Sequence, residues 1–174
     1  SPPKCIFDDI SQLMTNAMGV AQGARDEAET AFRSMIDRWL AERQQLILNY
    51  RQLRERPEPG TQADSELTAF CDILVDYVSA GHFEIYEQLL REAQDFDDQR
   101  GIELAHRVYP RIETITLQAV GFNDQYGQNA HADDEAAMQT QLQQLGGMLH
   151  ERFELEDCLI EVLHNAHKDL LSAV

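Results

Sequence analysis

The sequence predicts an all-α protein, an antiparallel four-helix bundle with an accessory N-terminal helix. Apolar residues recur at spacings of three and four in almost every stretch, which is the period of a helix with one buried face. No stretch alternates convincingly with a period of two, and no Asn-Gly or Asp-Gly pair separates two strand-like runs. The chain has 174 residues, of which 43% are hydrophobic and only 5 are proline, so it fits one domain with long ordered elements.

A weak helix is expected at residues 7–22 and a stronger one at residues 26–54. Glycines at positions 19 and 23 weaken the end of the first helix. The second helix carries a long apolar stripe and ends at residues 56–60, where two prolines remove backbone donors. We therefore expect an accessory helix in residues 1–25 and a helical-bundle domain in residues 26–174.

Three further helical stretches complete the bundle. The first covers residues 65–97, with Ser65 as its N-cap and Gly81 as a bend or a point of close packing. The second covers residues 102–126, and Pro110 should kink or interrupt it. After a polar loop at residues 123–133, the last helix is expected at residues 134–172. Four long amphipathic helices with short connections favour an antiparallel arrangement.

The chain is strongly acidic, with 31 Asp and Glu residues against 14 Lys and Arg and a net charge of −17. Binding to a nucleic-acid backbone needs clustered cations, so no direct DNA binding is expected. An acidic protein attracts basic surfaces and finds them quickly. The alternative is that the charge only keeps the protein in solution, and composition does not decide between the two.

The three cysteines, Cys5, Cys71 and Cys158, are spaced too widely for a paired zinc site. Cys71 and Cys158 fall in apolar stretches and are expected to be small core residues in a reducing compartment. No segment approaches the roughly 18 apolar residues needed to span a bilayer. The N-terminus has no apolar core of a signal peptide. These features indicate a cytoplasmic protein without a membrane partner.

Two charged residues, Arg43 and Glu156, fall on otherwise apolar helix faces. A lone charge inside a bundle is costly, so each should have a partner or reach the rim. Arg43 with Glu156 is one possible pair, and Asp37 and Arg152 are other candidates. Two interpretations are open: a structural ion pair that fixes the helix register, or a polar pocket that opens on a binding face.

The segment from Phe70 to Leu90 is apolar on more than one side. Beside its core stripe runs a second line, at spacings of three and four, that begins acidic and ends aromatic: Asp72, Asp76, Ser79, Phe83, Tyr86 and Leu90. An interior helix packed on two sides would show this pattern. A partner-binding face would show it too, with acids for attraction and an aromatic anchor. His82 is either a core histidine or a polar contact.

Three stretches of the sequence form a set of motifs. Residues 74–83 read LVDYVSAGHF and are followed by IYE at 85–87. Residues 37–40 read DRWL and are followed by Arg43, and residues 152–153 read RF, with LED at 155–157. In this order and spacing, from about residue 36 to residue 166, the chain resembles the Rsd/AlgQ, or regulator of sigma D, family of bacterial anti-sigma factors.

The resemblance implies a helical bundle that binds the C-terminal domain of the housekeeping sigma factor. That domain reads the −35 promoter element through a helix-turn-helix and must be basic on its DNA-facing side. Bound there, as a monomer in a 1:1 complex, an acidic protein would keep sigma from the polymerase core and the promoter. The resemblance places the partner-binding residues at Asp37, Arg38, Trp39, Arg43, Asp72, Asp76, Tyr77, Ser79, His82, Phe83 and Tyr86.

Rival functions have less support. Glu103 with His106, and Glu161 with His164, could suggest a carboxylate-bridged di-iron site in a bundle. However, Glu161 should face water, and the two patterns fall on the last two helices rather than on alternating ones. We expect no metal, no cofactor and no catalytic residues, since no P-loop, nucleophile elbow or dinucleotide motif is present. A helical scaffold or homo-oligomer without sigma binding remains the alternative.

Overall fold

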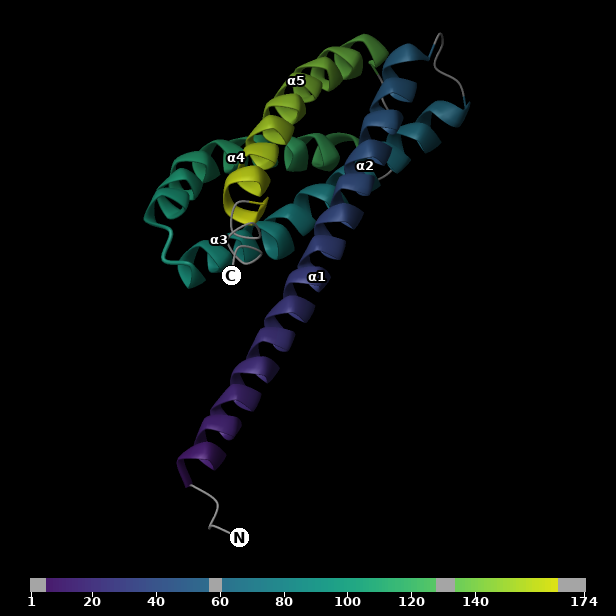
Figure 1. Ribbon diagram of the computed structural model, residues 1–174. Coiled ribbons are helices and arrows are strands. Elements are labelled where there is room, and N and C mark those ends of the chain that lie inside the picture. Colours follow the sequence, from purple (N-terminus) through teal and green to yellow (C-terminus); the bar gives the residue numbers. More distant parts are fainter. Residues whose placement is uncertain (1–5, 57–60, 128–133, 166–174) are drawn as a thin grey trace. The chain divides into compact units, whose positions relative to one another are not determined.

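A computed structural model of the chain describes residues 6–56, 61–127 and 134–165, with side chains from residue 23 onward except at 61–64. Within these ranges the backbone is helical and contains no strand, which confirms the all-α class. Two elements, η1 and η2, are π-helical turns. In chain order the elements are α1 (Ile6–Glu55), α2 (Thr61–Ala80), η1 (Gly81–Ile85), α3 (Tyr86–Asp95), α4 (Gln99–Tyr126), α5 (Glu135–Leu159) and η2 (Ile160–Asn165) (Figure 1).

The first two predicted helices are one continuous helix, α1. A glycine inside a helix costs only about 1 kcal/mol relative to alanine, which is too little to break so long an element. The chain forms two compact units, Ser1–Asp37 and Arg38–Val174, and α1 contributes to both. The accessory role of residues 1–25 stays a prediction. The site lies in the second unit, which is described below.

The other helices begin or end a few residues away from their predicted limits. Helix α2 begins at Thr61, so Ser65 lies inside the helix and does not cap it. Helix α4 begins at Gln99 and is capped by Asp98, whose carboxylate accepts from the Gly101 N–H at 2.9 Å. Asp134 caps α5 at its predicted start by accepting from the Ala137 N–H at 3.0 Å.

Helix α4 runs through Pro110 to Tyr126 without interruption. The helix ends at Tyr126, as predicted, so residues 123–126, which the predicted loop at 123–133 overlapped, are helical. Proline removes one backbone hydrogen bond from a helix interior, and a helix of this length tolerates that loss when its other face is buried. The predicted connections at 57–60 and 128–133, and the predicted helix end at 166–172, lie outside the described residues.

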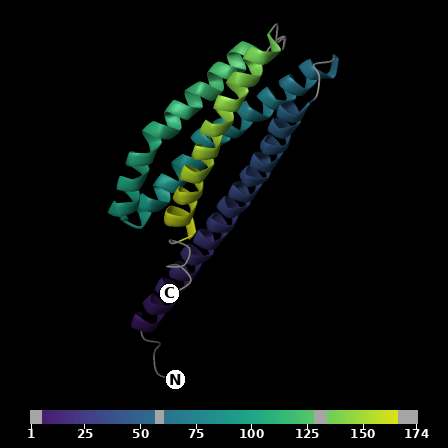
Figure 2. The ribbon, with the colours of Figure 1, turned by 90° about the horizontal axis from the view of Figure 1, so that it is seen from above.

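The helices of the second unit run antiparallel, as predicted. Residues late in one helix lie against residues early in the next. Figure 2 shows α4 beside α5, and α4 also packs against α2. Helices α1 and α2 meet through Trp39 with Tyr77 and Tyr50 with Phe70. Helix α4 meets α2 through Phe122 with Phe70, and meets α3 through Tyr109 with Tyr86. Helix α5 meets α4 through Glu151 with Arg111, and meets α1 through Asp157 with Arg43 and Gln139 with Arg54.

The core of this unit is built from the predicted apolar stripes. Its fully buried members include Leu46, Leu53, Phe70, Leu74, Tyr77, Ile85, Leu89, Ile115, Met138, Leu142, Leu159 and Leu163. Cys71 is buried as expected, but Cys158 is exposed, which corrects its prediction as a core residue. Cys158 precedes the stripe residue Leu159, and one helical step turns a side chain by about 100°.

None of the helices, over the parts of the chain that the structure describes, is long and apolar enough to span a membrane.

Candidate functional site

The outer face of the segment α2–η1 carries exposed acids and one exposed aromatic ring. Asp72 and Asp76 are exposed on successive turns of α2. Ser79 is half-buried one turn further along, and the Phe83 side chain on η1 is 68% exposed. The four residues belong to the second line of the predicted pattern, so the interior interpretation of that line does not hold for them.

Two further carboxylates belong to this face, Glu84 on η1 and Glu42 on the neighbouring helix α1. Burial raises the pKa of Glu42 on α1, and the charges of Asp76 and Glu84 raise it further, whereas Arg38 lowers it. Like charges raise a carboxyl pKa only when they lie close together. Asp76 and Glu84 therefore both lie near Glu42, with Arg38 as a nearby cation, and we call Glu42, Asp76 and Glu84 the acidic cluster.

The π-turn at Gly81–Ile85 decides which residues reach this surface. The backbone N–H of Tyr86 bonds to the carbonyl oxygen of Gly81, five residues earlier. A π-turn adds one residue to the helical register, so the positions beyond it are rotated relative to a continuous α-helix. As a result Tyr86, predicted to lie in line with Phe83, turns inward and is 5% exposed.

The inner face of the same segment binds a buried carboxylate. Glu156 on α5 is 1% exposed. It accepts hydrogen bonds from the hydroxyls of Tyr77, at 2.8 Å, and Tyr86, at 2.5 Å. Glu156 thereby joins α5 to residues on both sides of the π-turn.

Two arginines lie near the two carboxylate oxygens of Glu156. Arg43 and Arg152 each place a guanidinium nitrogen 3.7 Å from its carboxylate. Arg43 also donates to the Tyr77 hydroxyl at 3.0 Å, and Arg152 donates to the Tyr86 hydroxyl at 3.2 Å. The predicted Arg43–Glu156 pair is therefore present, with Arg152 as a second partner. Because these groups are buried, they fit the structural interpretation and not an open polar pocket.

Burial dominates the electrostatics of this group. It raises the pKa of Glu156, against the lowering effects of Arg152, Tyr86, Tyr77 and Arg43. Burial also raises the pKa of both tyrosines well above the usual value, and the Glu156 carboxylate raises it further. Both hydroxyls therefore remain protonated and serve as hydrogen-bond donors over the physiological range.

Trp39 packs this group against α1. Its indole N–H donates to the Tyr77 carbonyl oxygen at 3.0 Å, and its ring stacks on the Tyr77 ring with centroids 4.8 Å apart. A Cβ at Gly81 would lie 3.0 Å from the Trp39 ring, 3.1 Å from Arg152 and 3.2 Å from the Tyr86 hydroxyl. Gly81 is thus the point of close packing that the sequence predicted. We call Trp39, Arg43, Tyr77, Tyr86, Arg152 and Glu156 the buried polar cluster.

The eleven predicted partner-binding residues fall into two groups. Trp39, Arg43, Tyr77 and Tyr86 are buried in the polar cluster and offer a partner little surface. The exposed or half-exposed group comprises Asp37, Arg38, Asp72, Asp76, Ser79, His82 and Phe83. The His82 ring packs edge-on to the Phe83 ring, with ring centroids 4.8 Å apart, and His82 is exposed. The interpretation of His82 as a polar contact therefore fits, and its interpretation as a core histidine does not. Asp37 belongs to the first compact unit.

Sequence reasoning missed two acids of this face, Glu42 and Glu84. Glu84 directly follows Phe83, but α-helical phase placed it off the second line. Glu42 precedes Arg43 on another helix, and only the packing of α1 on α2 brings it near Asp76. The sequence signal that could have identified Glu84 is the number of acidic residues in and beside the LVDYVSAGHF motif.

The described residues contain no group of three or more His, Cys, Asp or Glu side chains arranged to hold a metal ion. Glu103 and His106 are exposed on α4, and Glu161 is exposed as predicted. His164 is buried and lies 3.3 Å from Glu92 on α3. The two Glu-x-x-His patterns are thus not brought together.

The second unit is therefore an all-α bundle with an exposed acidic and partly aromatic face. Residues 21–164 match the family described as regulator of RNA polymerase sigma(70) subunit, Rsd/AlgQ. The regulator of sigma D of Yersinia enterocolitica serotype O:8 is 33% identical over 133 residues, covering 73% of this chain and 78% of that protein. The regulator of sigma D of Enterobacter sp. strain 638 is 37% identical over 132 residues, covering 72% and 78%. The chain belongs to the Rsd/AlgQ family of sigma(70) regulators, as the motifs predicted.

Proposed function

We propose that this chain is a cytoplasmic anti-sigma factor that binds the C-terminal, −35-reading domain of the housekeeping sigma factor. By covering that domain it keeps sigma from the promoter and from the polymerase core. The acidic cluster of Asp76, Glu42 and Glu84, together with Asp72, carries the contact. The complex is 1:1 and involves neither DNA nor catalysis by this chain.

The proposal is supported most by the accessibility of Asp76 within a cluster of like charges. A helix-turn-helix domain is basic where it meets DNA phosphates. Carboxylates that repel one another attract such a surface, because the partner's cations relieve the repulsion on binding. Membership in a family of sigma(70) regulators supports the same partner class.

Asp76→Arg tests the proposal. We expect binding to the isolated C-terminal sigma domain to weaken at least tenfold, because the substitution places a cation in the face that meets a basic partner. Titration by fluorescence anisotropy at several salt concentrations measures the change, and wild-type affinity should fall as salt rises. Circular dichroism should show unchanged helix content.

Glu154→Arg is the matched control, because it makes the same charge change at an exposed acid on α5. It should bind almost as wild type does. If Asp76→Arg bound normally, the face would be misplaced. If the wild type formed dimers in sedimentation and did not bind the sigma domain, the alternative of a scaffold or homo-oligomer would replace the proposal.

A further inference from the structure

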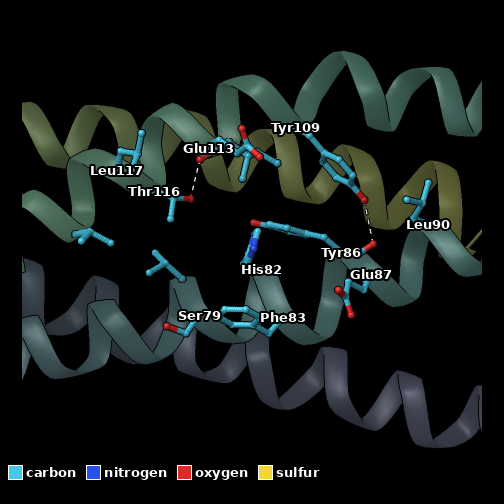
Figure 3. A pocket seen from close by; sticks show the side chains of 13 residues that line it. Ser79, His82, Phe83, Tyr86, Glu87, Leu90, Tyr109, Glu113, Thr116 and Leu117 are labelled. Carbon is cyan, nitrogen blue, oxygen red and sulfur yellow. Dashed lines mark hydrogen bonds between the residues drawn. The ribbon is translucent and has the colours of Figure 1, made fainter.

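A groove of about 480 Å³ lies between the segment α2–η1–α3 and helix α4. Figure 3 shows its labelled side chains approaching from the two sides, with Ser79 and Phe83 on one and Thr116 and Leu117 on the other. Most of its lining is apolar. The groove adjoins the acidic cluster because Ser79 and Phe83 lie on the same segment as Asp76 and Glu84.

The rim of the groove leaves large apolar side chains in water. Phe83 is 68% exposed, Leu117 is 70% exposed and Val120 is 38% exposed. On α4 the groove residues recur at spacings of three and four, which marks a second face of that helix: Glu113, Thr116, Leu117 and Val120. Contiguous apolar surface of this kind marks a site for a partner.

The charges around the groove define the chemistry of that partner. Glu87 and Glu113 are the charged carboxylates in its lining, which contains no Lys or Arg. Arg91 pairs with Glu87 at 4.0 Å across the exposed surface of α3, a weak contact that leaves the carboxylate available. The groove thus favours an apolar side chain with cations beside it.

We propose that this groove receives one apolar anchor side chain from a basic helix of the sigma-factor domain. The inference rests on the proposed function and divides the contact into two parts. The acidic cluster supplies attraction that salt weakens, and the groove supplies apolar burial that salt does not weaken. Helix α4, which the family motifs do not include, is part of the interface.

Leu117→Gln and Thr116→Phe test the groove from opposite directions. The first removes apolar surface from the rim, and the second fills the space that the anchor needs. Each should weaken binding to the isolated sigma domain roughly tenfold, with the same loss at low and at high salt. Asp76→Asn should behave differently, because it removes a charge and therefore reduces the dependence of affinity on salt.

Leu48→Gln is the matched control. Leu48 is 50% exposed on α1 and does not line the groove, so its substitution should leave affinity unchanged. Leu117 is exposed enough for its variant to fold, which circular dichroism and thermal unfolding should confirm.

The possible outcomes separate this inference from the proposed function. If wild type binds the sigma domain and both groove variants bind equally well, the groove is not an anchor site and the proposed function stands. If the groove variants changed the salt dependence of affinity but lost no affinity at high salt, the apolar role of the groove would be overturned. If wild type dimerises and Leu117→Gln abolishes the dimer without affecting sigma binding, a second copy occupies the groove. Absence of any wild-type binding would overturn both proposals.

Discussion

The two faces of the segment from Asp72 to Tyr86 differ in what their polar groups bind. On the inner face, the polar groups of Tyr77 and Tyr86 are satisfied by Glu156 and two arginines inside the bundle. On the outer face, Asp72 and Asp76 are exposed, and the charges of Asp76 and Glu84 raise the pKa of Glu42. One helical segment thus separates two tasks by direction: the inner groups hold the register, and the outer groups remain available to a partner.

Removing Glu156 should produce the largest loss of stability. Glu156→Ala leaves Arg43 and Arg152 buried without their shared carboxylate, and breaking a buried ion pair costs about 3–5 kcal/mol. Urea unfolding followed by circular dichroism measures this loss. Glu154→Ala, at an exposed acid on the same helix, should change the free energy of unfolding by less than about 0.5 kcal/mol.

The result would also separate the two faces. Because Glu156 lies inside, Glu156→Ala should lower stability far more than Asp76→Arg does. Equal losses for the two variants would contradict the division into a structural and a binding face.

High pH should destabilise the inner face selectively. Tyrosines in the unfolded chain lose their protons near pH 10, whereas Tyr77 and Tyr86 keep theirs in the folded state because their pKa values are raised. The folded state then binds more protons, so stability is complete below pH 10 and falls above it. The slope approaches about 1.4 kcal/mol per pH unit for each such tyrosine.

Urea midpoints measured from pH 8.5 to pH 11 check this expectation, and Tyr77→Phe should make the decline shallower. Absorbance at 295 nm gives an independent reading, because the two phenols should ionise only as the chain unfolds. Their ionisation near pH 10 in the intact protein would show that the cluster is open to water.

Gly81→Ala should have a smaller effect at the junction of the two faces. Its methyl group would press against Trp39, Arg152 and the Tyr86 hydroxyl, and overpacking of this kind costs about 1–3 kcal/mol. Gly147→Ala on α5 is the control, because no atom lies within 4 Å of its Cβ position. That variant should gain up to about 1 kcal/mol from helix propensity. Thermal unfolding of both variants compares them, and equal behaviour would show that Gly81 is not closely packed.

Much of the fold could be predicted from the sequence, because burial on one side of a helix leaves a period that the chain repeats. Leu46, Leu74 and Leu142 recur with this period along their helices, and all three are buried. The Arg43–Glu156 pair was also accessible, since a charge on an apolar stripe needs a partner. The prediction of Cys158 as a core residue was wrong because Cys158 directly precedes Leu159 on the apolar stripe, and one helical step is enough to turn its side chain toward water.

The candidate site could be predicted only in part. The motif around Asp76 identified the segment, but the π-turn changed which of its residues face outward. A π-turn depends on an extra residue being stabilised by contacts with other helices, here through Tyr86 and Glu156, and local sequence does not report that. Leu117 and Val120 were missed for a related reason, because the rotation of α4 about its axis is set by packing.

The hydrogen bond from the Tyr86 N–H to the Gly81 carbonyl oxygen also determines how the bundle would respond to the deletion of one residue at this turn. Deleting one residue from an ordinary helix turns every later side chain by about 100° and moves core residues into water. Within Gly81–Ile85 the same deletion would convert a five-residue turn into an α-helical one. Leu89 and Ala93 would keep their buried positions, and the structural damage would be confined to the bulge that carries Phe83. Losing a single residue within this turn should therefore disturb the core less than losing one within the α-helical part of α2 or α3.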